Sequence, residues 1–171
     1  MIPSLDPEAL LRSLFEAGLR YVVVGGIAVN AYGVIRATKD VDICPDPDRS
    51  NLERLAKLLR ELDVAQIGAD DFEEAEMPFD PRNVEDLAQG GNFRLRTSLG
   101  DLDVMQWLSG VPGELAYPVL AAEVMVVDVG GLEIPVCSLS HLRAMKRAAG
   151  RPQDLQDLAD LAVAQGDEEA G

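Results

Sequence analysis

The sequence predicts an α+β fold: a mixed β-sheet flanked by helices, with a C-terminal helical pair. Two observations predict it. Short apolar or alternating runs bounded by glycine and proline are typical of strands, and longer segments with apolar residues at helical spacing separate them or follow them. The chain of 171 residues is long enough for one domain with its own hydrophobic core.

The first half of the chain alternates between helices and strands. Helices are expected where apolar residues recur every three or four positions, and strands where they form a short run or alternate with charged residues. Ser50 is the expected N-cap of the third helix. The expected elements are a helix over 7–18, a strand over 21–24, a helix over 27–33, a strand over 39–44 and a helix over 50–62.

The second half is richer in strands and closes with helices. The acidic, proline-containing stretch 64–92 is expected to be a loop or edge segment with one helical turn. Ser138 or Ser140 is expected to cap the first C-terminal helix. The later elements are strands over 92–98 and 100–108, a hairpin over 124–138 that turns at Gly130-Gly131, and helices over 139–150 and 152–165. We therefore divide the domain into a core, 1–138, and a C-terminal helical extension, 139–171.

Charge and composition exclude several classes of protein. The chain has 15 basic and 30 acidic residues, a net charge of −15, which argues against a protein that coats DNA or RNA. One histidine and two isolated cysteines argue against a zinc site and against a Ser-His-Asp or Cys-His nucleophile. The N-terminus does not resemble a signal peptide, and no apolar run is long enough to span a membrane. We expect a soluble, reduced, cytoplasmic protein without membrane association.

One short segment brings together groups that bind anions and cations. Gly25-Gly26 follows a strand and opens a helix, so backbone N–H groups there can approach an anion closely. Arg36 and Thr38 are candidate phosphate contacts a few residues later. Asp40 and Asp42 lie two apart on the next strand, so both carboxylates face the same side, as ligands for Mg²⁺ or Mn²⁺ would. The order of these groups predicts a site for a metal-bound triphosphate.

The stretch VVVGGIAVNAYGVIRATKDVDI resembles the signature of the nucleotidyltransferase superfamily related to DNA polymerase beta. The GG form with RxTxDxD is similar to the abortive-infection toxin (AbiEii-like) branch and to the lincosamide and aminoglycoside nucleotidyltransferases. The resemblance implies the nucleotidyltransferase fold. It also implies an enzyme that uses two Mg²⁺ or Mn²⁺ ions to move an NMP from an NTP to an acceptor hydroxyl.

The resemblance further implies a third carboxylate, which acts as the base for the attacking hydroxyl or orients it. LGDLDVMQW offers Asp101 and Asp103, and Asp103 is preferred because it lies within the strand and not at its turn. The predicted catalytic and metal residues are thus Asp40, Asp42 and Asp103. The predicted nucleotide-binding residues are Gly25, Gly26, Arg36, Thr38, Lys146 and Arg151.

The last two of these come from HLRAMKRAAGRPQDLQDL, which resembles the final motif of the toxin-type family. That motif has Lys, Arg, Lys-Asp and Asp; here they fall on Lys146, Arg151, Gln153-Asp154 and Asp157, with Gln153 in place of a lysine. Both cations are expected to reach the triphosphate. Alternatively, Lys146 is a helix-surface lysine and Arg151 pairs with Asp154.

The acceptor stays open at this point. RNA or tRNA, an aminoglycoside-like small molecule and a protein are all compatible, and the acidic stretch 61–90 favours a cationic acceptor. A toxin or antitoxin partner is a further expectation. The alternative function is a catalytically degenerate protein of this fold that acts as a binding or regulatory partner, which the glutamine at 153 favours. Trp107 and Phe93 are expected in the core.

Overall fold

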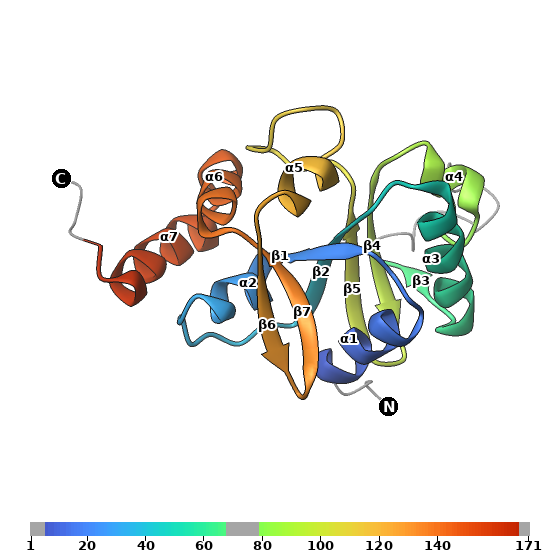
Figure 1. Cartoon of the computed structure of the whole chain (residues 1–171), viewed down its shortest axis with the longest axis horizontal. Helices are drawn as coiled ribbons and strands as arrows, with labels where there is room; N and C mark the ends of the chain where they lie inside the picture. The colour runs from blue at the N-terminus through green and yellow to red at the C-terminus, as the bar shows by residue number, and fades with distance from the viewer. Residues whose placement is uncertain (1–5, 68–78, 168–171) are drawn as a thin grey trace.

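The computed structural model describes residues 6–67 and 79–167 (Figure 1). A mixed sheet of seven strands forms its centre, in the order β3-β4-β5-β2-β1-β7-β6. The strands are β1 (Tyr21–Val24), β2 (Asp40–Pro45), β3 (Ala65–Gln66), β4 (Asn92–Thr97), β5 (Gly100–Met105), β6 (Val124–Val129) and β7 (Leu132–Cys137). The helices are α1 (Pro7–Glu16), α2 (Gly25–Ala31), α3 (Arg49–Glu61), α4 (Val84–Ala88), α5 (Tyr117–Ala121), α6 (Leu139–Ala149) and α7 (Pro152–Gln165).

The strand pairings explain why the sheet is mixed. β2 pairs in parallel with β5, and β1 pairs in parallel with β7. The neighbours β1 and β2, β4 and β5, and β6 and β7 pair antiparallel. Helices α6 and α7 lie at one end of the molecule and α3 and α4 at the other (Figure 1). The α+β fold with a C-terminal helical pair, predicted from the sequence, is therefore confirmed.

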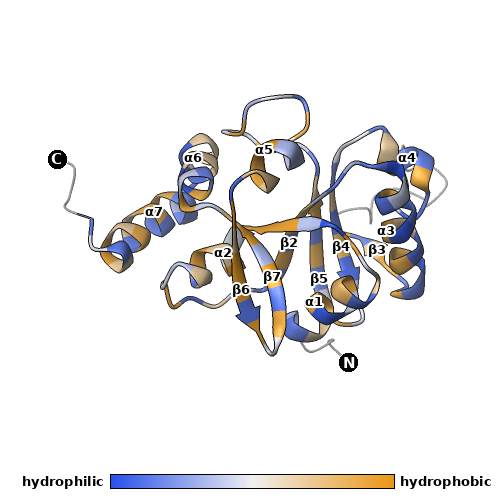
Figure 2. Ribbon diagram, viewed as in Figure 1, coloured by the Kyte–Doolittle hydropathy of each residue, from blue (hydrophilic) through white to orange (hydrophobic). Residues whose placement is uncertain are grey.

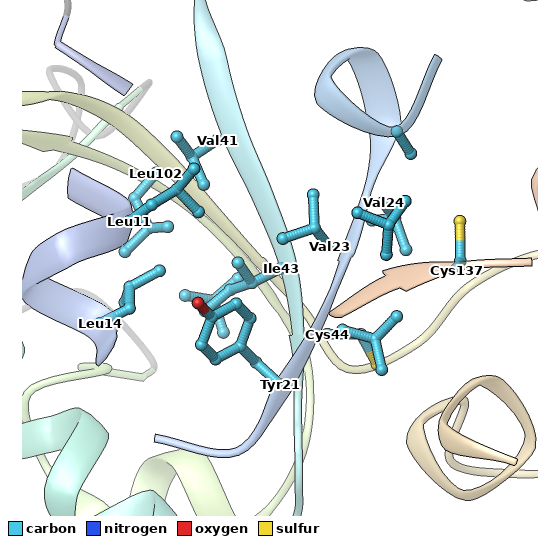
Figure 3. Packing of buried hydrophobic residues seen from close by; sticks show 14 of the residues in the cluster. Leu11, Leu14, Tyr21, Val23, Val24, Val41, Ile43, Cys44, Leu102 and Cys137 are labelled. Atoms are coloured by element: carbon cyan, nitrogen blue, oxygen red, sulfur yellow. The ribbon is translucent and has the colours of Figure 1, made fainter. Parts of the chain in front are cut away.

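The core lies against the middle of the sheet. All four residues of β1 are buried, and this strand is largely orange in the hydropathy view, whereas α3 carries both colours (Figure 2). Leu11 and Leu14 of α1 point toward the strands that carry Ile43 and Leu102 (Figure 3). Full burial of a leucine side chain stabilises the fold by about 1.5–3 kcal/mol, so this contact anchors α1 to the sheet.

The strands next to this core have one polar face. Burial alternates along β4 and β5, and the first half of β2 follows the same pattern. Because side chains alternate between the two faces of a sheet, the charged residues of these three strands lie on the same side. That side forms the floor of the site described below.

Several boundaries differ from the sequence-based expectations. Helix α2 begins at Gly25 and not at residue 27, and α3 begins at Arg49 with Asp48 as its N-cap, so the prediction of Ser50 as the cap is wrong. β5 ends at Met105, where the chain leaves the sheet, instead of continuing to residue 108. Ser138, one of two candidates, caps α6 by accepting a hydrogen bond from the backbone N–H of His141.

The segment expected to be a loop or edge contains the two-residue edge strand β3 and the short helix α4; residues 68–78 of it lie outside the described part. Helix α5 is not among the elements expected from the sequence. Among the residues that the structure describes, no helix is both long enough and apolar enough to cross a bilayer.

Candidate active site

Three carboxylates meet where β2 and β5 run side by side. In the parallel register Asp42 is opposite Asp103, and Asp40 is the next residue of β2 on the same face. Each of the three offers an oxygen atom, and these atoms lie within 4.8 Å of one another. Asp101 is opposite Asp40 but is not part of this cluster. The structure thus brings together the three residues predicted as metal ligands.

The cluster brings carboxylate groups together in a partly buried place, which disfavours their charged forms. Burial, followed by the charges of Asp103 and Asp40, raises the pKa of Asp42 to about 7. Burial also raises the pKa of Asp103. One oxygen of Asp103, Oδ1, is buried and accepts no hydrogen bond from the described residues. Carboxylate oxygens crowded in this way fit a divalent cation, which would replace the missing partners.

Gly25 allows Asp42 to occupy its place. The φ angle of Gly25 is +70°, and a Cβ atom there would lie 1.8 Å from Oδ2 of Asp42. Any side chain at this position would therefore collide with the carboxylate cluster. A Cβ on Gly26 would lie 2.7 Å from Cγ2 of Thr38 and 3.7 Å from Nη2 of Arg36. The glycine pair keeps β2 and the segment before it close to the start of α2.

A second cluster, which we call the C-terminal ion network, joins Arg36, Lys146, Arg151, Asp154 and Asp157. Arg36 donates to both oxygens of Asp157, at 2.6 and 2.5 Å, across 121 positions of sequence. Nζ of Lys146 lies 3.2 Å from Asp154 and 2.9 Å from Asp157. Arg151 donates to Asp154 at 2.7 Å. The network ties α7 to α6 and to the segment between α2 and β2.

Both acids of the network are buried and charged. Burial raises the pKa of Asp154, but hydrogen bonds from Arg151 and Lys146 outweigh it and lower the pKa overall. Burial also raises the pKa of Asp157, but hydrogen bonds from Lys146, Gln153 and Arg36 outweigh it and lower the pKa overall. Gln153 donates to Asp157 at 2.8 Å, so it contacts the same carboxylate as the two cations.

The two alternatives for the C-terminal cations are now resolved. Lys146 is not a surface lysine, because its side chain is only 11% exposed. Arg151 pairs with Asp154, as one alternative expected, while its side chain remains 76% exposed and lines the cavity. Both cations therefore lie at the site, Lys146 fixed by the network and Arg151 at its rim.

A cavity of about 680 Å³ opens over the carboxylates. Eight of the nine predicted site residues line it: Gly25, Gly26, Arg36, Asp40, Asp42, Asp103, Lys146 and Arg151. The ninth, Thr38, lies beside Gly26 and is not among the described residues that line the cavity. The cavity thus collects carboxylates on its floor and cations on its walls, as a metal-bound polyphosphate would require.

Comparisons with known proteins find solved structures with the same fold. A lincosamide antibiotic adenylyltransferase, LnuA, bound to lincomycin, is 14% identical, with a TM-score of 0.55 over 94% of this chain and 98% of that one. ANT(2″)-Ia in complex with adenylyl-2″-tobramycin is 16% identical, with a TM-score of 0.53 over 93% and 87%. A protein from Thermotoga maritima assigned as a nucleotidyltransferase is 19% identical, with a TM-score of 0.54 over 92% and 94%. The chain has the nucleotidyltransferase fold.

The similarity to these proteins is found in the structure and does not extend over the whole sequence. No protein-family model matches the chain, and no curated protein has a matching sequence. The nucleotidyltransferase fold was nevertheless predicted, because the resemblance rests on a short segment around the glycines and the first two carboxylates.

The sequence-based interpretation of this nucleotidyltransferase fold missed one wall of the cavity. Arg94 of β4 and Trp107 after β5 both line it. Trp107 is 53% exposed, so its expected place in the core is wrong, whereas Phe93 is buried as expected. The alternation in NFRLRT was a signal for Arg94, because it places this side chain on the polar face beside Asp103. Nothing local indicated that the strand ends before Trp107.

The C-terminal ion network should contribute strongly to stability. In the Asp157→Asn variant, Lys146 and Arg36 lose a buried anionic partner, and breaking such a pair costs about 3 kcal/mol. Urea unfolding of both proteins measures this difference. Asp160→Asn is the matched control, because Asp160 lies on the same helix and its hydrogen-bond partner among the described residues is the exposed Gln156. Its effect should stay within about 0.5 kcal/mol. Equal effects of the two substitutions would contradict the assigned role of the network.

Proposed function

We propose that the protein is a metal-dependent nucleotidyltransferase that transfers an NMP from an NTP to an acceptor hydroxyl. The observation that carries the proposal is the cluster of Asp40, Asp42 and Asp103 on the floor of a cavity whose walls carry Arg36, Lys146 and Arg151. The nucleotidyltransferase fold supports it, because the solved structures with this fold include two antibiotic adenylyltransferases.

The three carboxylates are the proposed ligands of two Mg²⁺ or Mn²⁺ ions. Bound there, the ions would neutralise charge on the triphosphate and on the attacking and leaving oxygens. Asp42 and Asp103 come from paired strands of one rigid sheet, so their relative position does not depend on a loop.

The triphosphate is assigned to the wall formed by Gly25, Gly26 and the basic residues. Arg36 and Lys146 are held by Asp157, so they present fixed positive charge without losing further side-chain freedom when the substrate binds. Arg151, more exposed, can close on the phosphates from the junction of α6 and α7. Thr38 supports this wall by packing on Gly26.

The reaction is an in-line displacement at the α-phosphorus. The acceptor oxygen forms a bond to this phosphorus, the bond to the bridging oxygen of the β-phosphate breaks, and pyrophosphate leaves with the electron pair. The acceptor proton passes to the carboxylate of Asp103 or to a base that Asp103 orients. The protein supplies position and charge, because little covalent chemistry is needed from it.

Thermal unfolding with each NTP and Mg²⁺ or Mn²⁺ tests the donor site. An NTP at about 100 times its dissociation constant should stabilise the protein by about 2.7 kcal/mol, or about 5–10 °C in the unfolding midpoint. The shift should require the metal and disappear in Asp40→Asn. No shift of the unfolding midpoint with any NTP would favour the alternative function given above, a catalytically degenerate protein that acts as a binding or regulatory partner.

The metal effect should depend on pH. Below pH 7 Asp42 is protonated, because its pKa is raised to about 7, and a proton then competes with the cation. Stabilisation by Mn²⁺ without nucleotide should therefore be larger at pH 8 than at pH 6. Thermal unfolding at the two pH values measures it. A shift that is larger at pH 6 would contradict the assignment of Asp42 as a ligand.

The two antibiotic-modifying neighbours are compatible with a small-molecule acceptor, and RNA or protein acceptors fit the same reaction. A toxin or antitoxin partner stays an expectation from the sequence resemblance. The composition of the remaining wall of the cavity narrows the choice of acceptor.

A further inference from the structure

The wall of the cavity opposite the proposed triphosphate site is formed by β4, the end of β5 and the residues after it. The strand order β4-β5-β2-β1 places the carboxylates between the two walls. Gly25 and Gly26 lie on the β1 side; Arg94, Met105 and Trp107 lie on the β4–β5 side. If the donor occupies the first wall, the attacking hydroxyl must approach from the second, next to Asp103.

Trp107 forms a preorganised flat surface on this second wall. The side chain of Asn92 accepts hydrogen bonds from the backbone N–H groups of Gln106 and Trp107, at 3.0 and 3.1 Å, and donates to the carbonyl of Trp107 at 3.0 Å. The indole ring lies against Gly90, where a Cβ would come within 3.0 Å of it. More than half of Trp107 is still exposed, at 53%. A fixed, exposed indole is suited to stacking on a flat unsaturated ring.

Among the described residues of the lining, Arg94 is the cation that the C-terminal ion network does not hold. Its side chain is 64% exposed, and its Nε lies 3.8 Å from Oδ1 of Asp103. This distance is too long for a hydrogen bond, so the N–H groups of the guanidinium remain available to another partner. An anionic group beside the acceptor hydroxyl would be such a partner.

The described part of the lining offers no carboxylate for a cationic acceptor. Among the described residues, its acids are Asp40, Asp42 and Asp103, which are committed to the proposed cations, and Asp154, which is buried against Lys146 and Arg151. Four basic side chains balance these four acids: Arg36, Arg94, Lys146 and Arg151. The cavity therefore does not share the acidity of the whole chain, which had favoured a cationic acceptor.

We propose that the β4–β5 wall is an acceptor subsite for a nucleotide: its base stacks on Trp107, its phosphate pairs with Arg94, and its ribose hydroxyl faces Asp103. This inference rests on the proposed function and names the acceptor class that the proposed function leaves open. A free nucleotide and the end of an RNA strand both supply this chemistry. The transfer joins the ribose oxygen to the α-phosphorus of the donor and releases pyrophosphate and the hydroxyl proton.

The single tryptophan of the chain makes the subsite directly observable, because its fluorescence reports only on this wall. The whole protein is first saturated with Mg²⁺ and the α,β-methylene analogue of its preferred NTP. Adenosine 5′-monophosphate, adenosine, a single-stranded RNA hexamer and kanamycin are then titrated separately. We expect the monophosphate to quench Trp107 and to bind about tenfold more tightly than adenosine, because it adds a charge-assisted hydrogen bond. Tighter binding of the hexamer would identify an RNA strand as the source of the nucleotide, and weaker binding a free nucleotide.

Arg94→Gln and Arg96→Gln form a matched pair for this test. Both arginines lie on the same face of β4, are exposed to a similar extent and sit 3.8 Å from an aspartate, but only Arg94 lines the cavity. In Arg94→Gln the preference for the monophosphate over adenosine should disappear, while in Arg96→Gln it should persist. Equal binding of the two ligands by the wild type, tighter binding of kanamycin, or equal effects of the two substitutions would overturn the proposal.

Failure of this proposal can be told apart from failure of the proposed function. If the NTP analogue with Mg²⁺ does not stabilise the protein, the donor site itself is wrong. If the analogue stabilises the protein but none of the nucleotide probes quenches Trp107, the donor site stands and only the acceptor subsite is wrong.

Discussion

The Asp42→Asn variant is expected to lose nucleotidyl transfer by about a thousandfold or more, because removing a proposed ligand of the catalytic cations should cost several kcal/mol in the transition state. The same variant should be at least as stable as the wild type in metal-free buffer at pH 8. Burial raises the pKa of Asp42 to about 7, so the folded protein bears the cost of a buried charge above that pH. Asparagine has the same shape and no charge.

The stability effect has a definite pH window. The metal-free wild type loses stability through this group as pH rises from about 4 to about 7, since the folded state binds the proton more tightly than the unfolded state does. The difference between wild type and Asp42→Asn should therefore be small at pH 4 and largest above pH 7. Urea unfolding in the presence of a chelator measures it, and pyrophosphate release measures transfer.

Asp101→Asn is the control for this prediction. Asp101 lies on the same face of β5 as Asp103, two residues before it, and carries the same charge, but it is not part of the cluster. It should keep transfer within a few-fold of the wild type. If Asp42→Asn retains a tenth of the activity, or Asp101→Asn loses as much as Asp42→Asn, the assignment of the metal ligands is wrong.

Gly25→Ala should disrupt the site and the fold together. At φ +70° a residue other than glycine costs about 1–2 kcal/mol. In addition, the new methyl group would overlap the carboxylate of Asp42, at 1.8 Å from Oδ2, and overpacking of this kind costs about 1–3 kcal/mol more. Because Asp42 must move, stabilisation by Mn²⁺ and NTP should be lost as well.

Gly18→Ala separates the two contributions. Gly18 has almost the same backbone angle, φ +69°, and no atom within 4 Å of the place of its Cβ. Its substitution should therefore incur only the backbone cost and leave the metal and nucleotide effects intact. Urea unfolding and ligand-dependent thermal unfolding of both variants provide the comparison. Equal destabilisation by the two substitutions would show that Asp42 does not occupy the space beside Gly25.

Local patterns predicted the parts of this protein that depend on neighbours in sequence. Four consecutive apolar residues predict strand β1, and the two glycines that follow them predict where the strand ends. Asp40 and Asp42 share a face because strands have a period of two. Asp103 could be preferred to Asp101 from its position within a strand, and the register of β2 and β5 then places it beside Asp42.

Other features depend on contacts between distant parts of the chain, which a single sequence does not encode in a readable pattern. Asp157 has the sequence context of a solvated helix residue, yet it is buried against Arg36, which precedes it by 121 positions. Trp107 has the apolar context of a strand, but the strand ends before it, since the side chain of Asn92 takes the hydrogen bonds that a paired strand would have made. In both cases tertiary contacts override local propensity.

The contact between Arg36 and Asp157 also sets an order of events during synthesis. A ribosome makes Arg36 121 residues before Asp157, and at about 5–20 residues per second this arginine stays without its partner for several seconds. All the strands of the sheet and the three carboxylates precede α6 in the chain, so they are synthesised before Asp157. A nascent chain that has just completed β7 would therefore carry the three carboxylates before Asp157 is available to hold Arg36 and Lys146 in place.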